Sequence, residues 1–405
     1  MKPKRIHILA LVLSVTVFNY CCYAATSESS AGETATNRPI ISTPGVTAAP
    51  SFYRALSEAK SGDVVAQANL GMMYLIGDGV AQDYKEAAQW LQKASDQGDA
   101  NSQYNLAILY ETGKGVAKDA VKSVELFKKA AQQGKAAAMV NLGTAYANGA
   151  GVQQDYRQAM NWFLEGGKGG QPTGFRNAAV LYEKGLGFRK NDRKAFKWFQ
   201  KAAESGDGKA QEKLAELYAE GKGVGQDNKE AVRWYLSAAE KGNLRAQAAL
   251  GGHYLVGKII EQNYDQAFHW LKLAADRGDA EAQFNLAYMY MNGLGLKADF
   301  EQAAKLYKAS AEQGDARGEF NLGICFILGR GVVQDNVEAA KWIILAANQN
   351  KGDEESKAAL QKLETMLSPG QLQDAKKRAE TFTPINTSKS GPNDFEILFE
   401  DHKNL

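Results

Sequence analysis

The sequence contains few cysteines, prolines and histidines, and each shortage excludes a class of protein. Its 405 residues include 3 cysteines, 8 prolines and 4 histidines, but 40 glycines. Three cysteines exclude a small fold built on disulfides, and the scarcity of proline separates the chain from low-complexity sequences rich in both proline and glycine. Because no two histidines have metal-ligand spacing and no Cys/His cluster exists, the sequence predicts no metal site and no small-molecule cofactor.

A surplus of charge of one sign is also missing. The chain has 48 Lys and Arg residues against 46 Asp and Glu residues, which gives a formal net charge of +2. A chain this close to neutral lacks the basic footprint of a nucleic-acid binder, so we predict no nucleic-acid partner. No stretch has the ~18 apolar residues that a membrane-spanning helix requires.

The first residues have the pattern of an export signal. A positive segment (residues 2–5) precedes an apolar run (residues 6–18) that has the length of a signal peptide rather than of a membrane span. Cys22 and Ala24 place small residues at the two critical positions of a cleavage site. The sequence therefore predicts a signal peptide over 1–24 and a periplasmic or secreted protein.

Two alternatives remain at this end of the chain. Cys21 or Cys22 would carry a lipid in a lipoprotein-type signal, although Asn19 and Tyr20 are not the small residues that such a site requires. A lipidated or uncleaved signal would attach the protein to a membrane. After cleavage one thiol remains, Cys325, which we expect to be a small buried hydrophobe.

A repeat of 36 residues dominates the sequence. Glycine returns at this interval eight times: Gly62, Gly98, Gly134, Gly170, Gly206, Gly242, Gly278 and Gly314. An aromatic residue keeps the same interval: Tyr74, Tyr110, Tyr146, Tyr182, Tyr218, Tyr254, Tyr290 and Phe326. Tryptophan shares a third register in six units: Trp90, Trp162, Trp198, Trp234, Trp270 and Trp342. A period of this length is typical of an array of helical hairpins.

Each unit is expected to form two helices. In the first unit, Leu70 and Tyr74 lie four residues apart and therefore on one face of a helix over 63–75. Gly62 suits the left-handed end of the preceding helix, and Asp63 suits the N-cap of the new one. One hairpin cannot bury its apolar face alone, so stacking on its neighbours must create the core.

A Gly-x-Gly turn separates the two helices of a unit. Gly77 and Gly79 are expected at positive-φ positions or where helices approach closely. A phosphate-binding loop is disfavoured, because the pair recurs in nearly every unit without a following Lys-Ser/Thr. Asp83 then begins the second helix, Glu86 completes a capping-box pattern, and Trp90 lies on the apolar stripe.

These residues resemble the Sel1-like repeat family, a relative of the tetratricopeptide repeat. The family pattern Ala-x-x-x-Leu-Gly-x-x-Tyr appears at 66–74, the Gly-x-Gly-Val turn at 77–80, and the second-helix pattern at 85–94. The match recurs eight times over 51–347. The resemblance implies an all-α, right-handed superhelical solenoid of stacked helix-turn-helix repeats, and a protein that acts as an adaptor, regulator or scaffold through protein contacts.

The segments outside the repeats have other predicted structures. Residues 25–50 are rich in Ser, Thr, Ala and Gly and are predicted to be a disordered linker. Residues 52–60 resemble a lone second helix that would cover the first repeat. A C-terminal helical cap is predicted over 348–382, with Ser368 as the N-cap of its last helix, followed by a disordered tail over 383–405.

Two units depart from the pattern. The fourth has a glycine-rich segment over 166–172 where other units have Lys-Ala-Ala, and the sixth has Lys258-Ile259-Ile260 in place of the second turn glycine and its flanks. A hinge or a contact loop is the functional interpretation of each departure. Neutral variation in a tolerant repeat is the alternative.

No catalytic group stands out in the sequence. His253 holds a first-helix position at which other units have Met73 or Leu109, so we expect it to be packed in the core. His269 shares its position with Gln89 and Lys197 and is expected to face solvent. Asp and Glu recur in register as helix caps, which explains them without acid–base chemistry. We therefore predict a protein with no catalytic residues.

The positions that vary between units are the candidates for partner binding. On the first helix, the positions equivalent to 68, 72 and 75 lie opposite Leu70 and Tyr74. In related hairpin solenoids this helix lines a concave groove, where exposed aromatic and charged residues would anchor a partner. The candidate residues are Tyr104, Arg176, Glu212, Phe284, Tyr288 and Phe320. The alternative is that the aromatic ones pack between neighbouring first helices.

Two functions from different classes follow. The first is an exported adaptor or regulator that binds a protein or peptide in the solenoid groove, for example a regulator of envelope signalling or of a cell-wall enzyme. The second is a cell-wall or β-lactam hydrolase of the Sel1-repeat type. A hydrolase requires a clustered nucleophile and base, which this sequence does not supply.

Overall fold

The computed structural model describes residues 50–349 and 354–385, which form 19 α-helices and, within these ranges, no strand. The predicted signal peptide, the linker up to residue 49 and the tail from residue 386 lie outside the described residues. Eight hairpins make up most of the chain: α3 (Val64–Ile76) with α4 (Tyr84–Asp96), α5 (Ala100–Thr112) with α6 (Ala120–Gln132), α7 (Ala136–Asn148) with α8 (Tyr156–Lys168), α9 (Pro172–Lys184) with α10 (Asp192–Glu204), α11 (Gly208–Glu220) with α12 (Asn228–Glu240), α13 (Leu244–Val256) with α14 (Tyr264–Asp276), α15 (Ala280–Asn292) with α16 (Phe300–Glu312), and α17 (Ala316–Leu328) with α18 (Asn336–Gln349).

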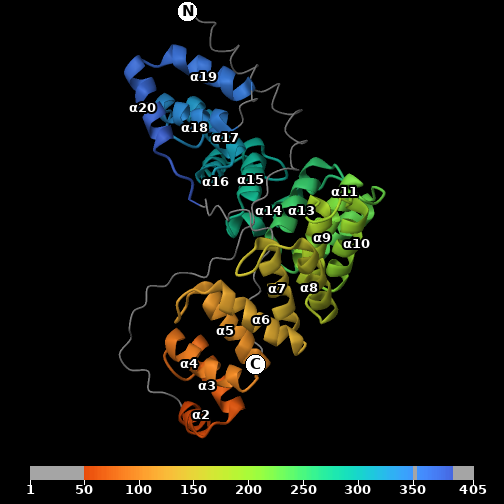
Figure 1. Ribbon diagram of the computed structural model, residues 1–405. Coiled ribbons are helices and arrows are strands. Elements are labelled where there is room, and N and C mark those ends of the chain that lie inside the picture. Colours follow the sequence, from red (N-terminus) through yellow and green to blue (C-terminus); the bar gives the residue numbers. More distant parts are fainter. Residues whose placement is uncertain (1–49, 350–353, 386–405) are drawn as a thin grey trace, which may run out of the picture.

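The hairpins stack in chain order into a curved array, with the first repeats at one end and the last at the other (Figure 1). From α2 to α19, every helix packs against the next one along the chain. Within the eight repeats, some first helices also pack directly against each other, as α3 does with α5 and α13 with α15. The first helices therefore lie on the inner side of the curve and the second helices on the outer side. The predicted all-α solenoid is confirmed.

The helix ends form as the recurring aspartates and glycines predict. The Oδ1 atom of Asp63 accepts a hydrogen bond from the backbone N–H of Ala66 at 2.7 Å, so Asp63 caps α3. At the other end of α3, Gly77 has a φ of 79° and donates its N–H to the carbonyl oxygen of Met73. Glycine adopts this left-handed conformation without the steric cost that a side chain adds.

In most repeats the second glycine of the turn also serves the stacking of repeats. Gly115 has a φ of 71°, and a Cβ atom on it would overlap the carbonyl oxygen of Tyr84 in the preceding repeat. The turn therefore requires glycine twice over, for its backbone conformation and for the close approach. Both predicted roles of the Gly-x-Gly pairs are confirmed.

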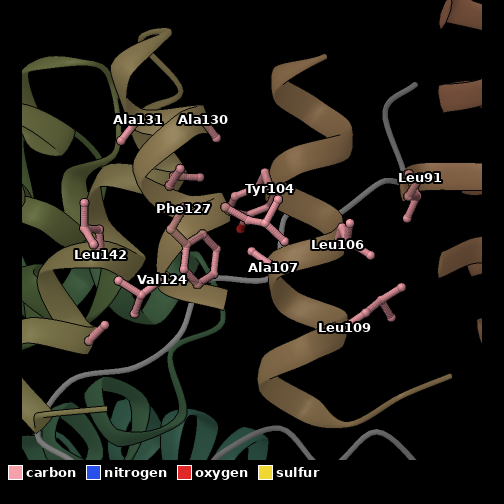
Figure 2. Close-up of a cluster of buried hydrophobic side chains, with 14 of the residues drawn as sticks. Leu91, Tyr104, Leu106, Ala107, Leu109, Val124, Phe127, Ala130, Ala131 and Leu142 are labelled. Carbon is pink, nitrogen blue, oxygen red and sulfur yellow. The ribbon is translucent and has the colours of Figure 1, made fainter. Parts of the chain in front are cut away.

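The hydrophobic core is continuous across the boundaries of the repeats. Tyr104 on α5 points toward Phe127 on α6, with ring centroids 5.9 Å apart, while Leu91 and Leu142 contribute from the flanking repeats (Figure 2). One cluster thus draws side chains from three successive repeats. Because each repeat completes the core of its neighbours, none is expected to be stable alone.

Additional helices cover both ends of the array, as predicted. At the start, α2 (Pro50–Lys60) packs on α3, and its Phe52 ring meets Tyr74 edge-on at 5.5 Å. At the other end, α19 (Glu354–Met366) and α20 (Pro369–Glu380) both pack on α18. Ser368 and Gln371 form a complete capping box at the beginning of α20.

Residues 381–385, here called the C-terminal strap, turn back onto the last repeats. The ring of Phe382 lies 5.1 Å from that of Trp342, and the backbone N–H of Ile385 donates to the carbonyl oxygen of Glu312 at 2.8 Å. The predicted disorder from residue 383 onward is therefore wrong for 383–385. A short apolar contact and one backbone hydrogen bond hold these residues, and no compositional signal marks either.

The glycine-rich segment of the fourth repeat is a packing feature. Gly166 and Gly167 lie inside α8. A Cβ atom on Gly166 would lie 2.6 Å from Val140 Cγ2, and one on Gly167 would lie 2.5 Å from the Phe175 ring. The missing side chains admit Phe175, which is 3% exposed, between α8 and α9. These two glycines therefore form neither a hinge nor a loop.

The isoleucine that departs from the pattern in the sixth repeat is also buried in the core. Ile259 stands where other repeats have the second turn glycine, and it is 9% exposed. It belongs to the same apolar cluster as Tyr235 and Leu250. The isoleucine adds buried surface to this cluster instead of forming an exposed contact loop.

Candidate partner-binding surface

The inner face of the array consists of the first-helix positions equivalent to Val65, Asn69, Met72 and Ile76. In the first repeat, Val65 and Ile76 are 63% and 49% exposed, Asn69 is exposed and Met72 is half-buried. Successive positions in this set are three or four residues apart, so they form one stripe along the helix. The stripe is not equally exposed in every repeat: in the third repeat the equivalent residues Ala137, Asn141 and Thr144 are buried.

The position equivalent to 68, in contrast, faces the next repeat. Arg176 occupies it on α9, and its Nε atom lies 3.1 Å from Asp207 Oδ2, with the two side chains 12% and 7% exposed. Thr173 Oγ1 donates to the same carboxylate oxygen at 3.3 Å. The other oxygen, Oδ1, caps α11 by accepting from the Ala210 N–H at 2.7 Å. Arg176 therefore ties α9 to the beginning of α11.

Glu212 makes the corresponding contact one repeat further along. It is 8% exposed, its Oε1 lies 3.2 Å from Arg245 Nε, and its Oε2 accepts a hydrogen bond from Asn243 Nδ2 at 3.0 Å. Burial raises the pKa of Glu212, and the nearby Arg245 charge opposes that shift. The carboxylate joins α11 to the start of α13.

The aromatic candidates at this position are also inter-repeat residues. Tyr104 is fully buried, with Lys135 Nζ of the next repeat 5.4 Å from its ring centroid. Phe320 is 8% exposed and belongs to the core of the last repeats. Phe284 is half-buried, with the Arg317 guanidinium 4.6 Å from its ring. The expected exposure is wrong for Tyr104, Phe320 and Glu212. The two aromatic residues pack between repeats, as the alternative stated.

Tyr288 is the one candidate at an inner-face position. It is half-buried, and Ile324 holds the equivalent place and a similar exposure in the next repeat. Partner binding by any of the six candidate residues stays a prediction. The positions of Val65 and Ile76 were missed, although their change of residue type along the chain, from Val65 to Lys209 for example, was visible in the sequence.

The middle of the inner face is charged. Lys213 on α11 lies 3.3 Å from Glu183 on α9 and 3.0 Å from Glu216, measured from Nζ to the carboxylate oxygens. Lys222 Nζ lies 3.4 Å from the same Glu183 carboxylate. Burial works to lower the pKa of Lys213, but Glu216 and Glu183 outweigh it and hold the pKa above its ordinary value. These ion pairs link two repeats and give the surface a polar centre.

The thiol and the two histidine side chains of the described residues lie where the sequence predicts them. Cys325 is 2% exposed, and burial raises the pKa of its thiol to about 12. His253 is half-buried with its ring 5.3 Å from that of Tyr235, and burial, followed by the Lys258 charge, lowers its pKa to about 4. His269 is exposed on α14.

The described residues hold neither a metal-binding cluster nor a membrane-spanning helix. No group of three or more His, Cys, Asp and Glu side chains in residues 50–349 and 354–385 has the geometry to hold a metal ion. Of the helices that the structure describes, none has both the length and the apolar character needed to cross a bilayer.

A model of the Sel1 repeat matches this chain eight times, at residues 64–99, 100–135, 136–170, 176–207, 208–243, 244–279, 280–315 and 316–351. The chain belongs to the Sel1-repeat family. Its fourth match begins late, at residue 176, directly after the glycine-rich junction through which Phe175 enters the core. Sel1 repeats support a protein-interaction scaffold as the general class of function.

Two solved Sel1-repeat structures are similar to this one. A Sel1 repeat protein from Oxalobacter formigenes has a TM-score of 0.58 and 27% identity, over 78% of this chain and 90% of that chain. The protein c5321, a protective antigen present in uropathogenic Escherichia coli strains, has 26% identity and a TM-score of 0.40, over 82% of this chain and 94% of that chain. The Oxalobacter structure shares the fold over most of this chain. No curated protein sequence matches the chain.

Proposed function

We propose that this Sel1-repeat protein is an exported adaptor or regulator that holds a segment of a partner protein against its inner face. One observation carries the proposal. The core position equivalent to Leu70 is leucine in seven repeats and alanine in the fourth. The inner-face position equivalent to Met72 instead changes its chemistry in almost every repeat: Met72, Ile108, Thr144, Val180, Glu216, Gly252, Tyr288 and Ile324. Thr144 is buried, and the larger apolar members of this set pack on one side against the core. No single residue type is required at the position, however, so its half-buried members are available to specify a partner.

The inner face is apolar toward both ends and charged in its middle. Val65 and Ile76 expose apolar surface in the first repeat, and Tyr288 and Ile324 do so in the seventh and eighth. Exposed apolar surface of this kind is typical of protein-binding sites. A partner segment with apolar residues toward its ends and charged residues between them fits this distribution.

Export is proposed from the N-terminal sequence. The positive residues 2–5, the apolar run 6–18 and the small residues before the cleavage point favour processing after Ala24. A regulator of envelope signalling or of a cell-wall enzyme would fit that location. Mass spectrometry of the exported protein should show an unlipidated N-terminus at Ala25. A lipid on Cys21 or Cys22 would place the protein on a membrane and contradict this part of the proposal.

The binding proposal is tested with paired variants. A partner captured from envelope extract and then purified should bind the double variant Tyr288→Ser, Ile324→Ser at least about tenfold more weakly than the wild type, since central apolar contacts dominate binding energies. The matched control is His269→Ser with Leu273→Ser, which removes an exposed apolar side chain from the outer face of α14. Thermal melting of both variants checks that the fold is intact.

Equal loss of binding in the two variants would contradict an inner-face site. The hydrolase alternative has its own assays, labelling by a fluorescent penicillin and digestion of peptidoglycan. Covalent labelling or peptidoglycan digestion that survives purification would replace the adaptor proposal with a catalytic one.

A further inference from the structure

The outer face of α10 differs from that of every other second helix in the repeats. This face consists of the positions equivalent to Lys85, Gln89 and Lys93, which are exposed in the first repeat. In α10 all three are cations: Arg193, Lys197 and Lys201. The other repeats carry mixed sets: Val121, Glu125 and Lys129; Arg157, Asn161 and Glu165; Lys229, Arg233 and Ser237; Asp265, His269 and Leu273; Glu301, Lys305 and Ala309; Val337, Lys341 and Leu345.

The turn before α10 and its first residues extend this positive surface. Arg189, Lys190 and Lys194 are exposed like the three helix cations, and the six together are called the basic ridge. Over 189–201 the only acidic residue is Asp192. In the described parts of the chain, no carboxylate forms an ion pair with any of the six, whereas Arg233 on the neighbouring α12 is paired with Glu230 at 2.8 Å. The ridge is thus an uncompensated charge on a chain that is nearly neutral as a whole.

The unusual packing of the fourth repeat supports one end of the ridge. Phe175, admitted by the glycines of α8, stacks on Trp198 with ring centroids 5.6 Å apart and an interplanar angle of 16°. Lys201 Nζ lies over the Phe175 ring at 4.5 Å. Cation–π contact orders the lysine side chain while its charge stays exposed. The glycine-rich segment and the charge of α10 are therefore parts of one local arrangement.

At the other end of the ridge, Lys190 replaces a glutamine that forms a hydrogen bond in most other repeats. Five other repeats have, at the position of Lys190, a glutamine whose Nε2 donates to a carbonyl oxygen near the end of the first helix, as Gln82 does to Leu75 at 2.7 Å. Lys190 replaces that amide with an exposed cation. Three of these five hydrogen bonds are exposed, and the second and seventh repeats also lack the glutamine, with Lys118 and Ala298 in its place. The fold therefore tolerates a cation at this position, and at Lys190 that cation adds to the ridge.

We propose that the basic ridge is a second docking surface, on the outer face, for an acidic segment of a partner protein in extended conformation. Residues four apart on a helix lie about 6 Å apart along its axis. Alternate residues of an extended chain lie about 6.6–6.8 Å apart. A segment with Asp or Glu at every second position, lying along α10, therefore brings one carboxylate opposite each of Arg193, Lys197 and Lys201.

The surroundings of the ridge favour a protein over a nucleic acid or a membrane. Sites for single-stranded nucleic acid combine cations with aromatic platforms for the bases, but here Trp198 is stacked on Phe175, and Tyr182 packs against Phe188 at 5.3 Å. Membrane-surface sites add exposed apolar side chains to the cations. Among the described residues, no large hydrophobic side chain between Val121 and Val256 is exposed.

The test measures binding of a labelled peptide of about twelve alternating Asp and Ser residues to the full-length processed protein by fluorescence anisotropy at low salt. The double variant Arg193→Gln, Lys197→Gln should bind this peptide about fivefold more weakly, because exposed ion pairs contribute modestly. Binding should weaken further as salt screens the charges. The matched control, Lys85→Gln with Lys305→Gln, removes the same charge from outer-face positions of two other repeats and should bind like the wild type.

Three results would overturn the proposal. The first is equal binding by the ridge variant and the control, the second is no measurable binding by the wild type, and the third is tighter binding of a thymidine oligonucleotide or of phosphatidylglycerol vesicles than of the peptide. The inner-face variant Tyr288→Ser, Ile324→Ser should retain full peptide affinity. Failure of the ridge is therefore distinguishable from failure of the proposed inner-face site.

Discussion

The Asp207 carboxylate makes two contacts at the same time: its Oδ2 atom pairs with Arg176 Nε at 3.1 Å, and its Oδ1 atom caps α11. The first helix of one repeat is thereby bonded to the start of the first helix of the next. Because both side chains of the ion pair are largely buried, the contact is shielded from solvent, unlike the surface pairs on the same array.

Removing the cation should weaken this junction. Arg176→Ala leaves the buried Asp207 carboxylate without its cationic partner, and we expect the free energy of unfolding to fall by about 2 kcal/mol. Urea denaturation measures the change. The control is Arg54→Ala, which breaks an exposed pair with Glu58 and should change stability by less than about 0.5 kcal/mol. Similar effects of the two substitutions would show that burial of the Arg176 pair does not matter.

Substitution of Gly115 tests whether the close approach between repeats requires glycine. Gly115→Ala adds backbone strain and an overlap with the Tyr84 carbonyl, so we expect a loss of about 3 kcal/mol or more. Gly98→Ala is the matched control, since Gly98 also has a positive φ, of 94°, but its Cβ would meet nothing within 4 Å. That substitution should cost about 1 kcal/mol. Equal losses would mean that the turn shifts to accept the methyl group.

Glu319 should make stability fall as pH rises. The carboxyl group is fully buried, and burial, with a smaller effect from Asp315, raises its pKa from 4.5 to about 8. The folded state keeps a proton that the unfolded state loses between these two values, so the free energy of unfolding falls across that window by up to about 1.4 kcal/mol per pH unit. Glu319→Gln should remove this dependence and stabilise the protein at pH 7.5, with little effect at pH 4.

The reverse substitution at the equivalent position of the preceding repeat also tests the Glu319 prediction. Gln349 Nε2 donates to both Glu319 carboxylate oxygens, at 2.9 and 3.0 Å, and Gln313 makes the same contact to Gln283 Oε1 at 2.8 Å one repeat earlier. Gln283→Glu should therefore introduce the pH dependence that Glu319→Gln removes. Parallel urea curves from pH 4 to 8 check both. A flat profile for wild type would refute the buried neutral acid.

His253 should have the opposite effect, making the free energy of unfolding fall as pH falls. Burial, and then the Lys258 charge, lowers its pKa from 6.5 to about 4, so its contribution is complete above pH 6.5 and is lost as pH falls toward 4. His253→Leu, the residue found at this position in the second repeat, should lose less stability than wild type between pH 6.5 and 5. The exposed His269→Leu is the control and should follow the wild-type profile.

Local patterns were sufficient for the fold because each signal acts within a few residues. Asp63 caps the helix that begins next to it, and Gly77 ends the same helix, so neither depends on distant structure. The packed environment of His253 followed from the register that it shares with Met73 and Leu109. Ile259 and the glycines of α8 could be located as departures, but their roles could not, because the side chains that they meet lie on other helices.

The candidate site was harder to predict because helical periodicity describes one helix at a time. Position 68 is indeed opposite Leu70 and Tyr74, but the start of the next repeat covers it, through Asp207 for Arg176 and Arg317 for Phe284. Whether the next repeat covers position 68 depends on the distance between successive repeats, and the sequence does not specify that distance. Tyr288, one helical turn further along, is half-buried and packs partly against the core cluster of Leu286 and Met289.

The C-terminal strap has a consequence for the size of the molecule. Stacked equivalent hairpins form an open-ended polymer, to which another unit can in principle be added at either terminus. Here Phe382 occupies the surface of Trp342, and Ile385 bonds back to Glu312, while Phe52 covers Tyr74 at the opposite terminus. Within the described residues these segments, together with α19 and α20, cover surface of the terminal hairpins on which a further hairpin would pack. Two short segments that are not themselves repeats thus act as terminators and set the number of repeats.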